Sequence, residues 1–302
     1  MQTMNTEPVP LFVNPVAGRG RAGRKIARVA AKLDSLCIDY RVVSSESAGD
    51  LENRVFEVAS DGVKRMMVAG GDGSIHEVTN GILRSGEPVE LGVIPIGTGN
   101  DFAKACAVPL DWEEALEQLA GRIRSGAPAR PIDAGRMNNR YFANGAGIGF
   151  DAKVTRIARA ISWRIGDLVY LVAVFKAMMD GVMTPKVTIR FSDRTYEGPI
   201  TLANVGNGAW VGGMFHIAPM AKIDDGRLDL VFAEPVSRPR IIALLPRLMR
   251  GSHIDQPEIT HATVSRCEIT ATAPVPSHLD GEVQPLQTYF EIEVLKGALR
   301  LL

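Results

Sequence analysis

The sequence predicts an α/β region followed by an all-β region, and three observations lead to this fold class. In the first half, short apolar segments run into glycine-bearing turns and then into stretches whose apolar residues recur with helical spacing. At residues 126–131 the stretch Gly-Ala-Pro-Ala-Arg-Pro breaks this pattern. Beyond it, apolar and polar residues alternate, as in antiparallel strands with one buried face. We therefore expect a parallel sheet with helices on its faces, followed by an antiparallel β-sandwich.

The first half repeats a unit of strand, turn and helix. We expect buried strands at residues 11–13, 40–43, 66–69 and 91–96. Helices with an apolar stripe are expected at residues 26–33, 51–58, 75–83, 102–107 and 112–124. In a parallel sheet of this kind, ligands bind outside the carboxyl ends of the strands. The turns that follow the strands are therefore the candidate functional segments.

The second half is expected to contain antiparallel strands and two helical inserts. Alternation is clear at residues 186–191, 195–203, 227–232 and 289–294. Helices are expected within 152–180 and at 240–250, where Pro246 should kink the second insert. The break before residue 131 divides the chain into domains 1–130 and 131–302, and the last residues could pack back on the first domain.

Composition limits the classes of function. Lys plus Arg (34) equals Asp plus Glu (34), so no overall field draws the protein to nucleic acid, and we expect no such partner. The three cysteines lie far apart, which argues against a disulfide framework or a cysteine zinc site. Residues 1–10 lack a signal-peptide pattern, and the longest apolar run, at 168–179, is too short to span a bilayer. We therefore expect a soluble, cytoplasmic protein.

The stretch Arg65–Val78, which contains Gly-Gly-Asp-Gly-Ser, combines a buried strand, a glycine turn and the start of a helix. Backbone N–H groups and the helix dipole at such a helix start favour phosphate, and glycine lets the main chain approach it closely. Asp72 would repel phosphate unless a cation lies between them, so this residue points to Mg²⁺ as well. The alternative is a structural turn in which Asp72 only caps the helix.

Two further strand-to-helix turns contain glycine and polar residues, at 97–101 (Gly-Thr-Gly-Asn-Asp) and at 14–23. The basic residues in and after the second of these turns are Arg19, Arg21, Arg24 and Lys25. They could contact phosphate or an acidic lipid head group, or they could be solvated surface charges. None of the glycine turns has the Lys-Ser/Thr of a Walker A loop or the spacing of a dinucleotide fingerprint. The sequence thus predicts a phosphate site of another kind.

Four segments taken together resemble a known family: Asn14–Gly18, Gly70–Glu77, Gly97–Phe102 and Leu279–Glu282. Their order and separation resemble the bacterial diacylglycerol-kinase-like lipid kinases, which are related to diacylglycerol, sphingosine and ceramide kinases. The resemblance extends over nearly the whole chain. It implies a nucleotide-binding catalytic domain at 1–130, like those of NAD kinases and phosphofructokinases. The β-sandwich domain at 131–302 would complete an active-site cleft between the two.

The resemblance implies ATP as the phosphate donor. Its contacts would be Asn14, Pro15, Gly18, Ser45, Gly71, Asp72, Gly73, Ser74, Ile75, His76, Glu77 and Thr98. Glu282 would be the general base that takes the proton from a lipid hydroxyl, which requires that it reach the attacking oxygen. The alternative for Asp280-Gly281, just before it, is a plain hairpin turn.

The resemblance also implies Mg²⁺. Asp225 would bind a structural Mg²⁺ with the backbone carbonyls of Lys222 and Arg227, and water would link this ion to Asp72 and Asp101. The alternative is that this Asp-Asp-Gly segment only forms a turn before a strand.

Two positions depart from the family pattern, which usually has Thr at 74 and Asn at 76. Ser74 keeps a hydroxyl that can donate to phosphate. His76 could also donate, or it could be a surface or capping residue. We expect ATP binding to tolerate both changes.

The resulting prediction is an ATP- and Mg²⁺-dependent kinase that phosphorylates a hydroxyl of a diacylglycerol-like or related lipid. The alternatives are a kinase of a soluble substrate, NAD or a sugar phosphate, and a catalytically silent nucleotide- or lipid-binding module. Both helical inserts combine basic and apolar residues, so they could contact the inner face of an anionic membrane, or pack their apolar sides on the sandwich. The sequence does not identify the lipid or the oligomeric state, and a homodimer is one of the states it allows.

Overall fold

Four parallel strands build the first part of the sheet, in the spatial order β4-β3-β1-β2. The computed structural model describes residues 7–15, 21–47, 49–161, 166 and 168–302. The strands are β1 (Val9–Val13), β2 (Tyr40–Ser44), β3 (Arg65–Gly70) and β4 (Glu90–Pro95). The helices are α1 (Arg21–Ser35), α2 (Asp50–Ser60), α3 (Asp72–Ser85), α4 (Asp101–Ala105) and α5 (Trp112–Ser125). The predicted parallel sheet with its helices is confirmed.

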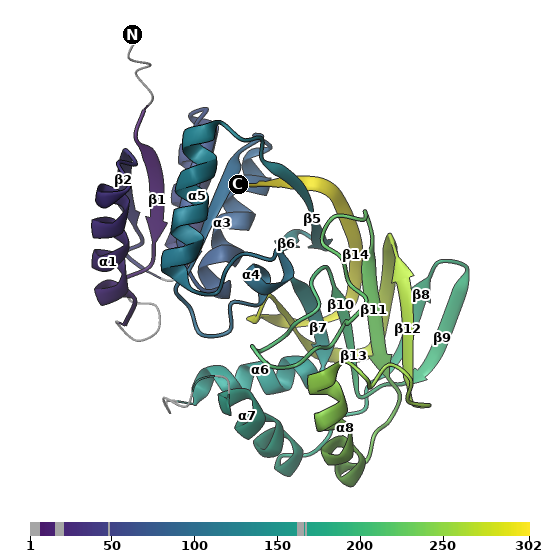
Figure 1. Ribbon diagram of the computed structural model, residues 1–302. Coiled ribbons are helices and arrows are strands. Elements are labelled where there is room, and N and C mark those ends of the chain that lie inside the picture. Colours follow the sequence, from purple (N-terminus) through teal and green to yellow (C-terminus); the bar gives the residue numbers. More distant parts are fainter. Residues whose placement is uncertain (1–6, 16–20, 48, 162–165, 167) are drawn as a thin grey trace.

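Side chains that alternate along the strands fill both faces of this sheet. Phe12 and Val68 pack with apolar residues of α2 and α3 on one face. Leu11 and Met67, their sequence neighbours, pack with residues of α1 and α5 on the other. Because helices cover both faces (Figure 1), the strands are continuous apolar runs rather than alternating ones.

The second half forms a β-sandwich in which antiparallel pairing dominates. Its strands are β5 (Arg130–Met137), β6 (Arg140–Phe142), β7 (Gly145–Gly149), β8 (Lys186–Phe191), β9 (Arg194–Pro199), β10 (Leu202–Gly206), β11 (Leu228–Ala233), β12 (Ile259–Val264), β13 (Arg266–Leu279) and β14 (Glu282–Leu301). One layer has the order β12-β11-β10-β7, and the other contains β9, β8, β13, β14, β5 and β6. The long strand β13 joins them, because residues 267–271 pair with β8 and residues 277–279 pair with β7.

One hydrophobic core lies between the two layers. Ile148, Leu230 and Phe232 come from the first layer, and Ile189 and Phe290 come from the second. All five are at most 1% exposed. Burying such side chains contributes about 1.5–3 kcal/mol each, so the layers hold together through this core.

The expected strand at residues 195–203 is wrong as a single element. Strand β9 ends at Pro199, and β10 begins at Leu202 and pairs with β7 and β11 in the opposite layer. Pro199 has no N–H group to continue a ladder. The next residues, Ile200 and Thr201, are buried consecutively instead of alternating, because the chain crosses the core there.

Strand β14 connects the sandwich with the parallel sheet of the first half. It pairs antiparallel with β13 and β5, and its end pairs parallel with β4 through Arg300 and Leu301. Figure 1 shows this strand in yellow, running back to the parallel sheet. The two halves of the chain therefore share one continuous sheet, which fixes the first residue of β14, Glu282, relative to the turns after β3 and β4.

Three helices cover one end of the sandwich: α6 (Phe150–Ala160), α7 (Leu168–Met179) and α8 (Arg238–Arg250) (Figure 1). They pack their apolar sides on one another and on β10 and β11. The second insert continues through Pro246. Within the described residues, no helix is both long and apolar enough to cross a membrane.

Candidate active site

The turns after β3 and β4 touch each other through glycine backbone. A Cβ added to Gly97 would lie 2.5 Å from Cα of Gly71, a distance that real side chains do not adopt. Gly71 is also the N-cap of α3, so the N–H groups at the start of this helix border the same space. Position 97 therefore needs glycine, a Cβ at Gly71 would be tight at 3.0 Å from Cα of Gly97, and the close approach leaves backbone donors facing a cavity.

A cavity of about 610 Å³ opens beside these turns. Its lining includes Asn14 and Lys25, which flank the turn after β1, and Thr98 from the turn after β4. The ammonium group of Lys25 donates to the carbonyl of Ile96 over 3.0 Å, which holds a positive charge at the wall of the cavity. Backbone donors together with this cation suit a polyphosphate.

Glu282 lies at the edge of this cavity. Its Oε1 would be 3.1 Å from a Cβ at Gly73, so the carboxylate and the glycine turn are adjacent. Its Oε2 is paired with Arg159 of α6 over 2.5 Å, and Arg159 also donates to the carbonyl of Gly281 over 3.0 Å. The sequence-based expectation that the late carboxylate and the glycine turn share one crevice therefore holds in the structure, while the catalytic role of Glu282 stays a prediction.

The segment before Glu282 is a two-residue hairpin turn, as the structural alternative predicted. Asp280 and Gly281 both have positive φ angles, of 51° and 86°, as expected for this turn type. The buried carboxylate of Asp280 accepts hydrogen bonds from the N–H groups of Ala143, Asn144 and Gly145 over 2.8–2.9 Å. The turn is thus fixed to the sandwich as well as shaped for a hairpin.

His76 contacts this turn rather than solvent. Its Nδ1 lies 2.9 Å from Oδ2 of Asp280, and both side chains are 3% exposed. Desolvation alone would raise the pKa of Asp280, but His76 and the N–H groups of Ala143 and Gly145 outweigh it and lower that pKa. His76 therefore links α3, which begins at the glycine turn, to the hairpin that carries Glu282.

Asp72 and Asp101 form an acidic pair between the two glycine turns. Oδ1 of Asp72 accepts from the N–H of Phe102 over 3.1 Å, and Asp101 accepts from the N–H of Gly213 over 3.0 Å. Desolvation, followed by repulsion from Asp101, raises the pKa of Asp72 to about 7. Oδ1 of Asp101 also lies 3.3 Å from Nζ of Lys104, which partly balances its charge. Carboxylate oxygens such as those of Asp72 and Asp101 are ligands that fit a divalent cation.

The remaining expected nucleotide contacts divide into three groups. Gly73, Ser74, His76 and Glu77 line the cavity together with Gly71 and Asp72. Among the described residues of the cavity wall we do not find Pro15, Ser45 or Ile75; Ile75 is 1% exposed and belongs to the core between α3 and the sheet. Gly18 lies outside the described residues, as do Arg19 and the side chains of Arg21 and Arg24.

Glu77 has a structural partner that the sequence did not reveal. Its Oε2 accepts from the N–H of Leu51 over 3.1 Å, so its carboxylate caps α2. Desolvation raises the pKa of Glu77, although hydrogen bonds from the N–H groups of Gly49, Leu51 and Glu52 oppose the shift. Glu77 thus lines the cavity and holds a neighbouring helix at the same time.

The expected Mg²⁺ ligands at residues 222–227 lie in an exposed turn. Oδ1 of Asp225 accepts from the N–H of Arg227 over 3.0 Å, as in the structural alternative. Across the part of the chain that the structure describes, no cluster of three or more His, Cys, Asp or Glu side chains could hold a metal ion. The roles of Lys222, Asp225 and Arg227 therefore stay predictions.

Two arginines of the cavity wall were not predicted as site residues. Arg140 forms a two-pronged pair with Glu52 over 2.9 and 2.7 Å, and Arg159 holds Glu282. Arg159 is one of the basic residues of the first insert, for which the sequence left membrane contact and packing on the sandwich as alternatives. Only the folded chain shows that it points to the hairpin, since its partner is 123 positions away.

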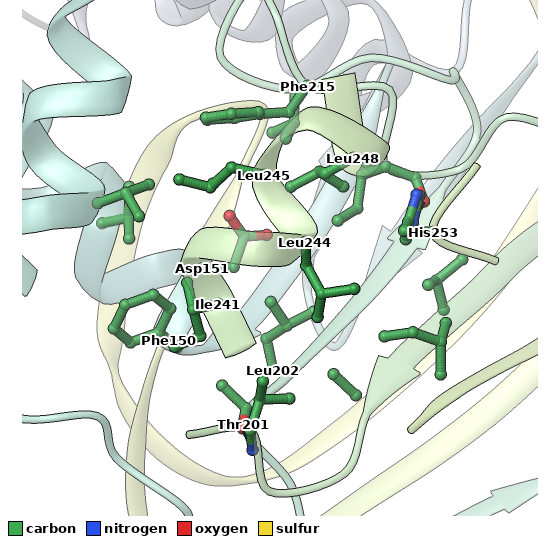
Figure 2. A pocket seen from close by; sticks show the side chains of 18 of the residues that line it. Phe150, Asp151, Thr201, Leu202, Phe215, Ile241, Leu244, Leu245, Leu248 and His253 are labelled. Atoms are coloured by element: carbon green, nitrogen blue, oxygen red, sulfur yellow. Dashed lines mark hydrogen bonds between the residues drawn. The ribbon is translucent and has the colours of Figure 1, made fainter. Parts of the chain in front are cut away.

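Two further cavities continue from Asp72 into the sandwich. A polar pocket of about 40 Å³, bordered by Asp72 and Asp101, is lined by Asn144, Asn204 and His278. Beyond it lies an apolar chamber of about 100 Å³, whose wall is formed by residues of α6, α7 and α8 and adjoining strands. Figure 2 shows Ile241, Leu244, Leu245 and Leu248 of α8 around this chamber, with the carboxylate of Asp151 among them. Tyr170 and Val211 line both the polar pocket and the chamber.

The comparison with known proteins agrees with this arrangement in both halves. Residues 8–131 match the family model of the diacylglycerol kinase catalytic domain, and residues 145–302 match that of the YegS C-terminal NAD kinase beta sandwich-like domain. The chain is 30% identical over 273 residues to the diacylglycerol kinase of Bacillus subtilis (strain 168), covering 90% of this chain and 88% of that one. A protein of Alcanivorax borkumensis named "Probable lipid kinase YegS-like" is 31% identical over 278 residues, covering 87% and 89%.

A solved structure shares the whole fold. The crystal structure of a diacylglycerol kinase from Bacillus anthracis str. Sterne superposes with a TM-score of 0.74 at 25% sequence identity, covering 98% of this chain and 96% of that one. Fold, glycine turns and family models together define a kinase. The chain belongs to the diacylglycerol-kinase-like lipid kinase family.

Proposed function

We propose that this protein is an ATP- and Mg²⁺-dependent kinase that phosphorylates a hydroxyl group of a diacylglycerol-like or related lipid. One observation carries the proposal: the cavity at the glycine turns, the polar pocket and the apolar chamber form a series with shared walls. Asp72 lines the first two, and Tyr170 lines the last two. A soluble acceptor such as NAD or a sugar phosphate has no use for an apolar chamber next to the transfer site.

The nucleotide would occupy the cavity at the glycine turns. Bound ATP and Mg²⁺ would supply the phosphoryl group and the charge that neutralises it. The N–H groups at the start of α3, the ammonium of Lys25 and the hydroxyl of Thr98 would hold the phosphates. Asp72 and Asp101 would hold the cation, because a positive charge relieves the repulsion between them that helps to raise the pKa of Asp72.

Glu282 would accept the proton of the lipid hydroxyl through Oε1, which faces the glycine turn. Arg159 fixes the other oxygen, so the carboxylate is held in one orientation. The acyl part of the lipid would enter the chamber. Contact with its apolar wall would stabilise the bound lipid by about 25 cal/mol for each Å² of apolar lipid surface removed from water. Catalysis would then rest on positioning and charge neutralisation.

We also propose contact with an anionic membrane through α7 and α8. Leu168, Phe175 and Met179 of α7 and Ile242 and Met249 of α8 are 40–76% exposed. The opposite sides of both helices line the apolar chamber, so a lipid could pass from the bilayer into it. Exposed cations on the same helices, at Lys176 and Arg247, would favour acidic lipid.

Liposome flotation tests this contact. Phe175→Asp should reduce binding to vesicles that contain anionic lipid, because a negative charge at this position opposes insertion into an anionic membrane. Leu286→Ser removes an equally prominent exposed apolar side chain on β14, 61% exposed, and should bind as the wild type does. If the wild-type protein fails to float at low salt, membrane contact is rejected.

The proposed activity is tested with γ-labelled ATP, Mg²⁺ and a mixed lipid extract. Label in the organic phase is expected. Label on added NAD or fructose 6-phosphate would identify a soluble acceptor instead, and no label on any acceptor would favour a silent binding module.

A further inference from the structure

Two polar atoms around the polar pocket are buried and have no hydrogen-bond partner among the described residues. They are Oδ1 of Asn144 and Oδ1 of Asn204, on residues that are 7% and 2% exposed. Both residues line the pocket. Buried polar atoms are nearly always paired in folded proteins, so two of them at one cavity indicate a polar ligand.

The chemical character of these two atoms is fixed by the partners of the Nδ2 atoms in the same amide groups. Nδ2 of Asn144 donates to the carbonyl of Trp210 over 2.7 Å, and Nδ2 of Asn204 donates to the carboxylate of Asp151 over 3.2 Å. Carbonyls and carboxylates only accept, so neither amide can be turned round. The oxygen atoms of both amides must therefore be the ones without a partner, and they can only accept.

A carboxylate adds to this acceptor surplus. Asp151 lies at the chamber end, 3.2 Å from Nε2 of His278. Nδ1 of His278 accepts from the N–H of Gly281 over 3.2 Å, so Nε2 carries the proton and is directed toward Asp151. Thr155 and Tyr170 also line the pocket, and even with their hydroxyl groups counted as donors, the space offers more acceptors than donors.

We propose that the polar pocket binds the head group of the acceptor lipid and selects one with a second hydrogen-bond donor close to the hydroxyl that is phosphorylated. The shared chemistry is that of a diol or an amino alcohol, as in a monoacylglycerol or a sphingoid base. This inference rests on the proposed lipid kinase function and narrows its substrate class.

A diester fits this pocket poorly. Diacylglycerol has one hydroxyl group and two esters that only accept, so it would leave the oxygen atoms of Asn144 and Asn204 unpaired in a buried site. A site built around hydrogen bonds discriminates strongly against a ligand that lacks them. The chamber is also small: at about 100 Å³ it has room for part of one chain without rearrangement.

The test compares three acceptors of matched chain length in mixed micelles: a monoacylglycerol, a sphingoid base and a diacylglycerol. We expect kcat/KM for the better of the first two to exceed that for diacylglycerol by about ten- to a hundredfold. Asn204→Leu should lower this preference by about tenfold while the Kd for Mg-ATP is unchanged. Ser277→Ala is the matched control, since its hydroxyl is also buried and without a partner but lies outside the pocket wall.

The Asp151→Asn variant distinguishes the two candidate head groups, the amino alcohol and the diol. It should lower kcat/KM for the cationic sphingoid base and leave kcat/KM for the uncharged monoacylglycerol unchanged. Equal or better use of diacylglycerol by the wild type overturns the inference and leaves the lipid kinase function standing. A preference that Asn204→Leu, confirmed as folded, does not change also overturns it. If no lipid at all is labelled, the proposed function itself fails, and this inference with it.

Discussion

Removal of the Asp280 carboxylate should destabilise the protein strongly. Asp280→Ala would leave the N–H groups of Ala143, Asn144 and Gly145 without their acceptor and would also remove the partner of His76. Each buried donor without a partner costs about 1–3 kcal/mol. Water can enter the space of the lost side chain, so we take the lower end for each and expect a loss of about 3–5 kcal/mol.

This loss is a large part of the stability of an ordinary protein, which is about 5–15 kcal/mol. It is measured as the shift of the urea midpoint at pH 7, followed by fluorescence and circular dichroism. Asp193→Ala is the control, because Asp193 also lies in a hairpin turn, between β8 and β9, but is exposed. The control should change the free energy of unfolding by less than about 0.5 kcal/mol.

The pH dependence adds a second check on the same residue. The pKa of Asp280 is lowered in the folded state, so its contribution to stability is present above the unfolded value and is lost as pH falls through the folded one. The wild type should therefore lose stability below about pH 4 more steeply than Asp280→Ala does. A loss of under 1 kcal/mol for Asp280→Ala at pH 7, equal to that of the control, would refute the reasoning.

Three other predictions concern the walls of the nucleotide cavity. Asp72→Asn should raise the urea midpoint at pH 8 without Mg²⁺ and abolish turnover. Burial and the charge of Asp101 raise the pKa of Asp72 to about 7, so the folded protein loses stability as pH rises through that value and the carboxylate becomes charged, whereas asparagine stays neutral. An unchanged midpoint and an unchanged metal dependence would count against this role of Asp72. Gly97→Ala should weaken ATP binding at least tenfold, because its Cβ would lie 2.5 Å from Gly71; calorimetry measures this, and wild-type affinity would disprove the contact. Glu77→Ala should cost about 1 kcal/mol of stability through the cap of α2, read from the urea midpoint; no change would show that the cap is dispensable.

The α/β half was predictable because its signals are local. Apolar runs such as the one around Val68 end in glycine turns, and helical spacing follows at once. The sandwich was harder to predict. Strand β7 (Gly145–Gly149) has three glycines among five residues and so shows no apolar alternation. Strands β12 and β13 were not predicted, and β9 and β10 were joined into one, because layer changes depend on packing that no local pattern encodes.

The same difference between local sequence signals and contacts between distant segments applies to the site. The glycine turns and Glu282 could be named from motifs, and the structure brings them together. The partners that hold them could not: Arg159 of α6 and His76 of α3 reach the final hairpin across more than 120 positions of sequence. The apolar chamber is likewise assembled from three helices and several strands, each of which reads as an ordinary apolar or amphipathic segment on its own.

The central claim is that the carboxylate at position 282, held against the glycine turn, takes the proton from a lipid hydroxyl. The most direct measurement is the rate of label transfer from γ-labelled ATP to the organic phase by Glu282→Gln, compared with wild type under saturating ATP. Loss of a positioned base costs about 10²–10⁴-fold, so we expect a fall in kcat of that size with an unchanged Kd for ATP. Transfer by Glu282→Gln at the wild-type rate would contradict the account.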